Sequence, residues 1–214
     1  MRFGLRLQRK RRVKRRTWMV AAASVGLLRT VWAAADVGQK APSFEVTDTT
    51  GRKRTLAEFA GKPVVLEWTS NSCPFVRAQY DSGKMQEVQR WATGQGVVWL
   101  SVLSTHPSRG DFLAPAKADA FNKSRKAAPT ALLIDSTGQA GRAYGARTTP
   151  HMFVIAADGS VAYAGAIDTK ATVDAAVVAR SRNLVRAALE DLLAGRKVAT
   201  ARTTPYGCMV GYEG

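Results

Sequence analysis

The chain has 214 residues, and 46% of them are hydrophobic, which is enough for one ordinary domain with a sizeable core and short extensions. A net charge of +16 is typical of proteins that bind nucleic acid or membranes, but residues 1–35 carry ten of the 32 Lys and Arg residues and no acid. The remaining residues hold 22 basic against 16 acidic side chains, a net +6. The charge of the domain therefore gives no reason to expect a nucleic-acid partner.

The first 35 residues have the pattern of an export signal. A basic stretch ending in Arg15-Arg16 precedes an apolar run over residues 17–28, which is too short to span a bilayer. The paired arginines resemble a twin-arginine signal, and the small residues that follow offer a cleavage site after Ala35. We expect cleavage, no stable membrane span afterwards, and a periplasmic or otherwise exported domain, where disulfides persist. An uncleaved membrane anchor or a basic nucleic-acid-binding tail is the alternative.

The first half of the mature chain predicts strands flanking a helix. Residues 38–56 alternate around turn residues and predict a short hairpin. The apolar runs 62–68 and 96–104 predict two strands that are buried on both faces. Between them we expect a helix over residues 73–93, weakened or kinked at Gly83. A strand–helix–strand order implies a right-handed crossover and parallel pairing of the two strands.

The second half predicts a terminal antiparallel hairpin and a closing helix. Together the elements predict an α/β fold: a thioredoxin-like three-layer sandwich with a mixed central sheet and flanking helices over residues 36–195, followed by a polar tail over 196–214. The expected elements of this half are a helix at 115–126, a strand at 130–135, a short helix at 139–144, a hairpin of 148–155 with 160–167, and a helix at 176–194.

Cys73 and Cys208 are the two cysteines of the chain, and Cys73 stands where a strand ends and a helix begins. The unpaired N–H groups and the dipole of a helix start favour a negative charge, and Arg77 follows one turn later. Both features predict a lowered thiol pKa and hence a reactive thiolate. The alternative is a small buried apolar cysteine without chemistry. Val76 occupies the place of the second cysteine of a C-x-x-C motif.

Three segments carry a resemblance to a known family. The sequence CPFV after VVLEWTSNS, TTPHMFVI downstream and GQKAPSFEVTDTTG upstream are similar to the alkyl hydroperoxide reductase/thiol-specific antioxidant (AhpC/TSA) redoxins, over residues 37–193. The resemblance implies that Cys73 is the attacking cysteine and that Pro150 is the cis-proline facing it. It also implies that Glu67 is a buried acid whose pKa is raised by burial and which shuttles a proton during exchange. No cofactor and no metal are expected.

The sequence departs from the family at two positions. Val76 removes the usual internal resolving thiol, and Leu66 replaces the proline of the peroxidase pattern, in which Ser70 and Cys73 do match. Cys208 in the tail is a candidate resolving thiol, as in peroxiredoxins that resolve from the C-terminus, or one half of a structural disulfide.

We therefore expect an exported thiol–disulfide oxidoreductase acting on protein thiols or disulfides with an external thiol electron donor. A peroxiredoxin-like thiol peroxidase acting on a small peroxide is the first alternative. A non-catalytic thioredoxin-fold binding module is the second. His106 and His151 show no metal-ligand spacing; His151 is interpreted as a structural histidine, with tuning of the Cys73 thiolate as the other reading.

Overall fold

The computed structural model describes residues 35–213, together with Met1 and Gly4. The expected export signal, apart from these few positions, lies outside the described residues. Among the helices of the described residues, none is both long and apolar enough to cross a membrane.

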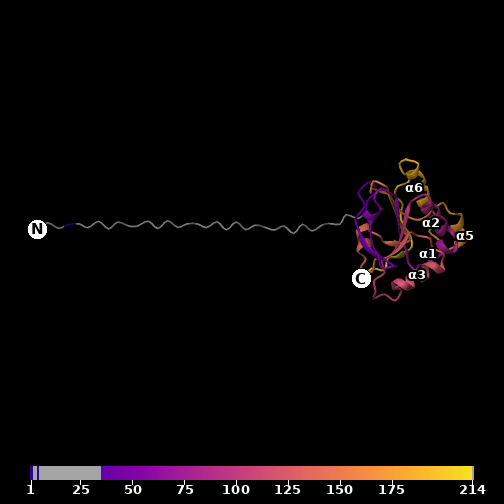
Figure 1. Ribbon diagram of the computed structural model, residues 1–214, viewed down its shortest axis with the longest axis horizontal. Helices are drawn as coiled ribbons and strands as arrows, with labels where there is room; N and C mark the ends of the chain where they lie inside the picture. The colour runs from indigo at the N-terminus through magenta and orange to yellow at the C-terminus, as the bar shows by residue number, and fades with distance from the viewer. Residues whose placement is uncertain (2–3, 5–34, 214) are drawn as a thin grey trace. The chain divides into compact units, whose positions relative to one another are not determined.

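A seven-stranded mixed sheet forms the centre of the domain (Figure 1). The three middle strands β5, β4 and β3 are parallel, and antiparallel strands extend the sheet on both sides, in the order β2-β1-β5-β4-β3-β7-β8. The expected central sheet is thereby confirmed. Its strands are β1 (Glu45–Asp48), β2 (Lys53–Thr55), β3 (Val64–Trp68), β4 (Val98–Leu103), β5 (Ala131–Ile134), β7 (His151–Ile155) and β8 (Val161–Gly165).

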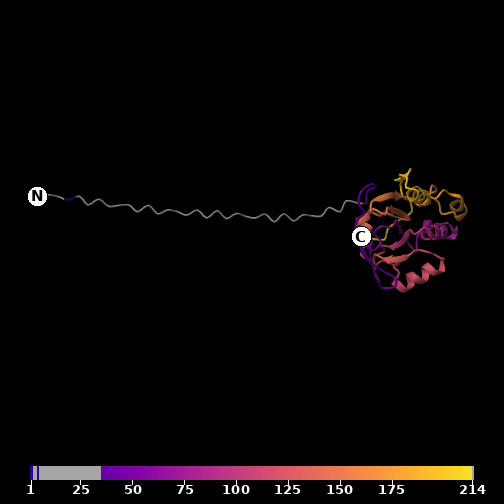
Figure 2. The ribbon, with the colours of Figure 1, turned by 45° about the horizontal axis from the view of Figure 1, so that its top comes forward.

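Helices cover both faces of this sheet because successive strand side chains point to opposite faces. Along β3, Val65 packs into the cluster formed with α1, α2 and α6, whereas Leu66 packs into the opposite cluster with α4. Figure 1 and Figure 2 show α6, α2, α1 and α3 along one side of the sheet. The helices are η1 (Leu56–Phe59), α1 (Pro74–Asp81), α2 (Lys84–Gly94), α3 (Pro115–Ser124), α4 (Gln139–Tyr144), α5 (Ala175–Arg180) and α6 (Leu184–Leu193).

Two expected helices are each divided in two. The helix after Cys73 is interrupted at Gly83, where the sequence predicted a weak or kinked point. The φ of Gly83, 79°, lies in the left-handed region that favours glycine. The prediction of one helix over residues 176–194 was wrong: α5 ends at Arg180, and α6 begins after Asn183. The Asn183 side chain accepts a hydrogen bond from the N–H of Arg186, so it caps a new helix start that apolar periodicity does not reveal.

The expected strand 148–155 is also divided, at Pro150, which has no N–H to donate to a ladder. Its first part, β6 (Thr148–Thr149), leaves the main sheet and pairs antiparallel with β9 (Cys208–Met209) from the tail. The tail is therefore a packed part of the domain. Thr203 hydrogen bonds with Ala164 on β8, and the Tyr212 hydroxyl donates to the carbonyl of Ala146 at 2.8 Å.

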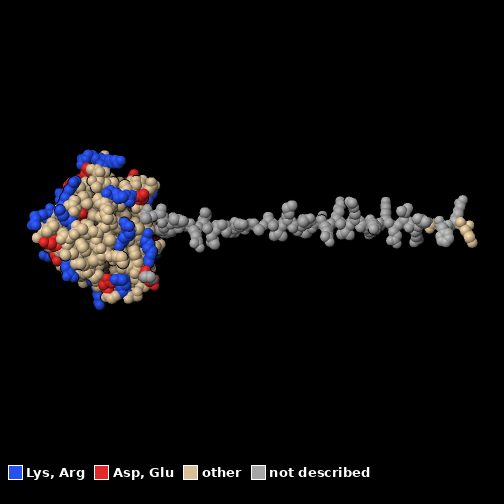
Figure 3. All heavy atoms as spheres, turned by 180° about the vertical axis from the view of Figure 1, so that it is seen from behind, with Lys and Arg blue, Asp and Glu red and all other residues tan. Residues whose placement is uncertain are grey.

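The surface agrees with the moderate charge of the domain. On the face displayed in Figure 3, Lys and Arg side chains are spread among acidic and neutral residues rather than gathered in one patch. The core is apolar and aromatic. Trp68 and Trp99 are fully buried, and the Trp68 indole N–H donates to the Ser104 hydroxyl at 3.0 Å.

Candidate functional site

Cys73 lies at the N-terminal end of α1, directly after the loop that follows β3. It occupies the N-cap position, with Pro74 in the first turn, where a missing N–H costs nothing. The loop is held by Ser72, whose hydroxyl donates to Asp111 at 2.7 Å. The Cys73 side chain is only 2% exposed and packs beside Val76 in the cluster under α1. The sequence therefore predicted the position of this thiol but not its burial.

The Thr149–Pro150 segment faces Cys73. The peptide bond between these two residues is cis, which confirms the conformation expected at Pro150. The Cys73 thiol donates a hydrogen bond to the Thr149 carbonyl oxygen, with Sγ and O separated by 3.0 Å. Residues 76 positions apart in the chain thus meet at the start of α1.

Cys208 is brought to the same place by the pairing of β9 with β6, in which it lies directly opposite Thr149. The preceding residue, Gly207, has a φ of 123°, and a Cβ there would overlap the Thr149 carbonyl. Glycine is therefore required for the tail to approach this closely. Both cysteines are free thiols in the structure, and Cys208 is half-buried.

The two thiols have opposite pKa shifts. Burial raises the pKa of Cys73. Hydrogen bonds from the Cys208 thiol, the Thr149 hydroxyl and backbone N–H groups lower it by more, so the pKa lies below its ordinary value of 9.0. Burial, the hydrogen bond to Cys73 and the negative charge of its thiolate raise the pKa of Cys208 to about 12. Cys73 is consequently the first of the pair to become a thiolate.

Glu67 is completely buried on the face of β3 that α1 and α2 cover. Its carboxylate accepts four hydrogen bonds. One comes from the Tyr80 hydroxyl at 2.9 Å, and three converge on Oε2, from Gln89 at 3.0 Å, Trp99 at 2.8 Å and Ser101 at 2.8 Å. The described residues provide no hydrogen bond from Glu67 to either cysteine. Its expected proton transfer stays a prediction.

The side chains of the remaining candidates make no hydrogen bond to either thiol. Arg77 is exposed on α1, and within residues 35–213 its guanidinium has no hydrogen bond or ion pair. His106 lies in a loop, where its ring contacts Ser108. His151 is buried, and burial together with the positive charge of Arg147 lowers its pKa to about 4, so its imidazole is neutral at pH 7. Within residues 35–213 no group of His, Cys, Asp and Glu has a metal-binding arrangement.

Cys208 lines a cavity of about 320 Å³ beside the paired strands β6 and β9. Much of the lining consists of hydroxyl-bearing side chains, with Arg109 and Asp111 beside them. Cys73 is not part of this lining. A molecule entering the cavity therefore meets Cys208 first. The hydroxyl-bearing residues are Thr69, Ser70, Ser72, Ser104, Thr105 and Thr149.

A buried polar network fixes the loop that carries Cys208. The Tyr206 hydroxyl and the Gln79 amide both donate to Asp168, which is 3% exposed. The Tyr206 ring also packs on Phe75, with centroids 5.8 Å apart. These residues were absent from the sequence-based site. A tyrosine two residues before Cys208 is the one local signal that could have indicated such an anchor.

A mixed sheet with a cysteine at the start of the first long helix and a cis-proline opposite it defines a thioredoxin-like redoxin. The chain matches the AhpC/TSA family over residues 37–164 and belongs to that family, whose members are thiol-dependent oxidoreductases. The expected family and the expected thioredoxin-like fold are both confirmed.

Solved structures share the fold at low sequence identity. A hypothetical protein of Sinorhizobium meliloti is 24% identical with a TM-score of 0.71, covering 85% of this chain and 97% of that one. An uncharacterized conserved protein of Geobacillus kaustophilus is 23% identical with a TM-score of 0.70, covering 83% and 93%. A proposed protein disulfide isomerase of Bacteroides thetaiotaomicron is 18% identical with a TM-score of 0.54, covering 75% and 91%. Among curated proteins, none matches the sequence.

Proposed function

We propose that this protein is an exported thiol–disulfide oxidoreductase in which Cys73 and Cys208 form the redox couple. The observation that carries the proposal is the meeting of both cysteines at Thr149. Its carbonyl accepts the Cys73 hydrogen bond, and its strand pairs with that of Cys208. The opposite pKa shifts support it further, because a thiolate next to a protonated thiol is the arrangement from which disulfide exchange proceeds.

The different burial of the two sulfurs supports roles that differ from the expected ones, in which Cys73 attacks the partner and Cys208 resolves the mixed disulfide. In the oxidised protein a partner thiolate attacks Cys208, which lines the cavity, and Cys73 leaves as a thiolate held by its hydrogen bonds. A second thiol of the partner, as its thiolate, then attacks the partner's own sulfur in the mixed disulfide and releases Cys208. The partner is oxidised to a disulfide and the protein takes up two electrons. In reverse, Cys73 is the nucleophile that attacks a mixed disulfide on Cys208. Stabilising the Cys73 thiolate favours the reduced protein, and hence oxidation of partner dithiols.

The other residues expected at the site have supporting places in this proposal. Pro150 is buried and directly follows Thr149, whose carbonyl contacts Cys73. Arg77 is exposed one turn beyond Cys73, where it can contact an acidic partner. Glu67 is the proposed proton carrier, supported by its complete burial beneath α1.

Trapping experiments with a cysteine peptide activated as a disulfide test the proposed pairing. In Cys73→Ser, Cys208 forms a stable adduct that mass spectrometry detects. In the wild type Cys73 displaces the peptide, leaving a Cys73–Cys208 disulfide and a free peptide thiol. Cys208→Ser reacts slowly because Cys73 is 2% exposed. Equal adducts in both single variants, or a stable adduct in the wild type, would contradict the pairing. A variant lacking both cysteines is the control.

Reduction of a small peroxide is the second candidate, favoured by the AhpC/TSA family match. Peroxide would oxidise Cys73 to a sulfenic acid, and Cys208 would condense with it to a disulfide and release water. Peroxide-dependent consumption of a thiol donor that is lost in Cys73→Ser would place this reaction first. A structural disulfide in a binding module would instead have a reduction potential below about −300 mV.

For residues 1–35 we propose a cleaved export signal, supported by their basic and apolar pattern. N-terminal sequencing of the exported protein should find Asp36 as its first residue. Replacing both Arg15 and Arg16 by Lys should block export if the signal is of the twin-arginine type. Recovery of the intact N-terminus in the membrane fraction would instead identify an anchor.

A further inference from the structure

A larger cavity, of about 730 Å³, lies on the face of the sheet away from α1 and α2. Strand β7 contributes His151 and Phe153, α4 contributes Tyr144, and the tail closes the cavity with residues 202–205 and Tyr212. The thiol pair belongs to the opposite face, and neither cysteine lines this cavity. Its volume falls in the range of ligand sites, about 300–1,000 Å³.

The lining is positively charged. Three arginines contribute, Arg142, Arg147 and Arg202, and no acidic side chain of residues 35–213 lines the cavity. Arg202 pairs with Asp36, and Arg142 donates to backbone carbonyls. Within the same stretch the Arg147 guanidinium has neither an ion pair nor a hydrogen bond. The charges of Arg142 and Arg147 therefore both lack an acidic partner within these residues, and the Arg147 side chain is exposed.

A neutral donor and aromatic surfaces lie beside the charge of Arg147. His151 accepts the Arg147 backbone N–H on Nδ1 at 3.3 Å, so the proton of its neutral ring is assigned to Nε2. The His151 ring lies 4.5 Å from that of Phe153, centroid to centroid, and Tyr144 packs against Phe153 at 5.4 Å. These rings are at most 5% exposed because they pack on one another, so they form the buried wall of the cavity.

We propose that this cavity binds a small aromatic carboxylate, a function beyond the thiol chemistry. The carboxylate pairs with the Arg147 guanidinium, whose planar fork fits two carboxylate oxygens, and the ring packs against the apolar part of the cavity lining.

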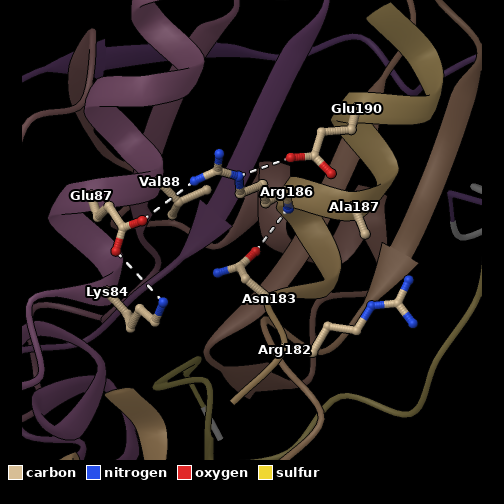
Figure 4. Close-up of a pocket in the computed structure, with 8 residues that line it drawn as sticks. All are labelled: Lys84, Glu87, Val88, Arg182, Asn183, Arg186, Ala187 and Glu190. Atoms are coloured by element: carbon tan, nitrogen blue, oxygen red, sulfur yellow. Dashed lines mark hydrogen bonds and ion pairs between the residues drawn. The ribbon is translucent and has the colours of Figure 1, made fainter. Parts of the chain in front are cut away.

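The cavity between α2 and α6 also has cationic side chains but differs in being lined by two acids, Glu87 and Glu190 (Figure 4). There Arg186 pairs with Glu87 at 3.3 Å and with Glu190 at 2.9 Å, and Lys84 also contacts Glu87. Arg182 has no ion pair within residues 35–213, but the two carboxylates would repel an anion, so this cavity of about 320 Å³ carries no anion proposal. Arg186 instead provides a matched control position.

Binding of 2-naphthoate to the full chain, measured by calorimetry, tests the proposal, with the uncharged 2-naphthamide as the control ligand. We expect saturable binding of 2-naphthoate that Arg147→Gln weakens by at least about tenfold and Arg186→Gln leaves unchanged. The amide should bind at least about tenfold more weakly than the acid. Arg147→Gln is expected to fold because its side chain makes no bond within residues 35–213.

The chain has two histidines, so nuclear magnetic resonance gives a second readout. Naphthoate should shift the ring signals of His151 and not those of His106, which lies outside the cavity lining. No binding, equal binding to Arg147→Gln, or a shift confined to His106 would overturn the proposal. Cys73→Ser should bind naphthoate like the wild type, so this outcome is independent of the redox function.

Discussion

Replacing Glu67 by Gln tests how the buried carboxylate stabilises the domain. In the most favourable orientation of the new glutamine side chain, the amide oxygen takes the place of Oε2 and accepts the three hydrogen bonds that converge there. The amide NH₂ then faces the Tyr80 hydroxyl. Tyr80 already accepts from Gln89 at 3.0 Å, so its own proton loses its acceptor. A buried donor without a partner costs about 1–3 kcal/mol. The amide avoids the cost of burying a charge, which offsets its weaker hydrogen bonds as a neutral acceptor. We therefore expect the free energy of unfolding to fall by about 2 kcal/mol.

Urea unfolding followed by tryptophan fluorescence measures this loss, since Trp99 donates to Glu67 and reports on its surroundings. Glu190→Gln is the matched control. The Glu190 side chain is 51% exposed and pairs with Arg186 on the surface of α6, so its loss should cost less than about 0.5 kcal/mol. Equal stability of both variants and the wild type would refute the network argument. Proton transfer by Glu67 predicts a separate effect, a changed pH profile of disulfide exchange in the folded variant.

Three other substitutions have expected outcomes. Thr149→Val removes the hydroxyl that lowers the Cys73 pKa, so thiolate absorbance at 240 nm should appear at higher pH; an unchanged profile would exclude that hydrogen bond. Burial raises the pKa of Asp48, but hydrogen bonds from neighbouring hydroxyl, guanidinium and backbone groups outweigh it and lower the pKa from 3.8 to about 2. This stability is present above pH 3.8 and lost towards pH 2, so Asp48→Asn should cost about 2 kcal/mol in urea at pH 7 and nothing below pH 2; a pH-independent cost would contradict this. Tyr206→Phe loses its bond to Asp168 and should cost about 1 kcal/mol in the same assay and speed proteolysis of the tail, whereas intact tail protection would refute the anchoring role.

The local pattern of apolar, polar and turn residues was sufficient to predict most of the fold. Continuous apolar runs predicted the buried parallel strands β3 and β4, and the turn at Asp48–Gly51 predicted the first hairpin. Gly83 marked a weak point where the structure has a helix break. The errors came where a side chain competes with the backbone pattern, as at Asn183, whose capping oxygen begins a new helix inside an apparently continuous apolar period.

The sequence by itself determined that a cysteine begins a helix after a buried strand and that a proline lies in a strand further on. Both follow from residue type and neighbours. Only the tertiary structure decided that the tail adds strand β9 beside Thr149, bringing Cys208 to Cys73. These contacts join residues 59 and 135 positions apart and depend on packing of the whole domain, which no local pattern encodes. The burial of Cys73 and the absence of a hydrogen-bond partner for the Arg147 guanidinium within residues 35–213 also depend on the tertiary structure.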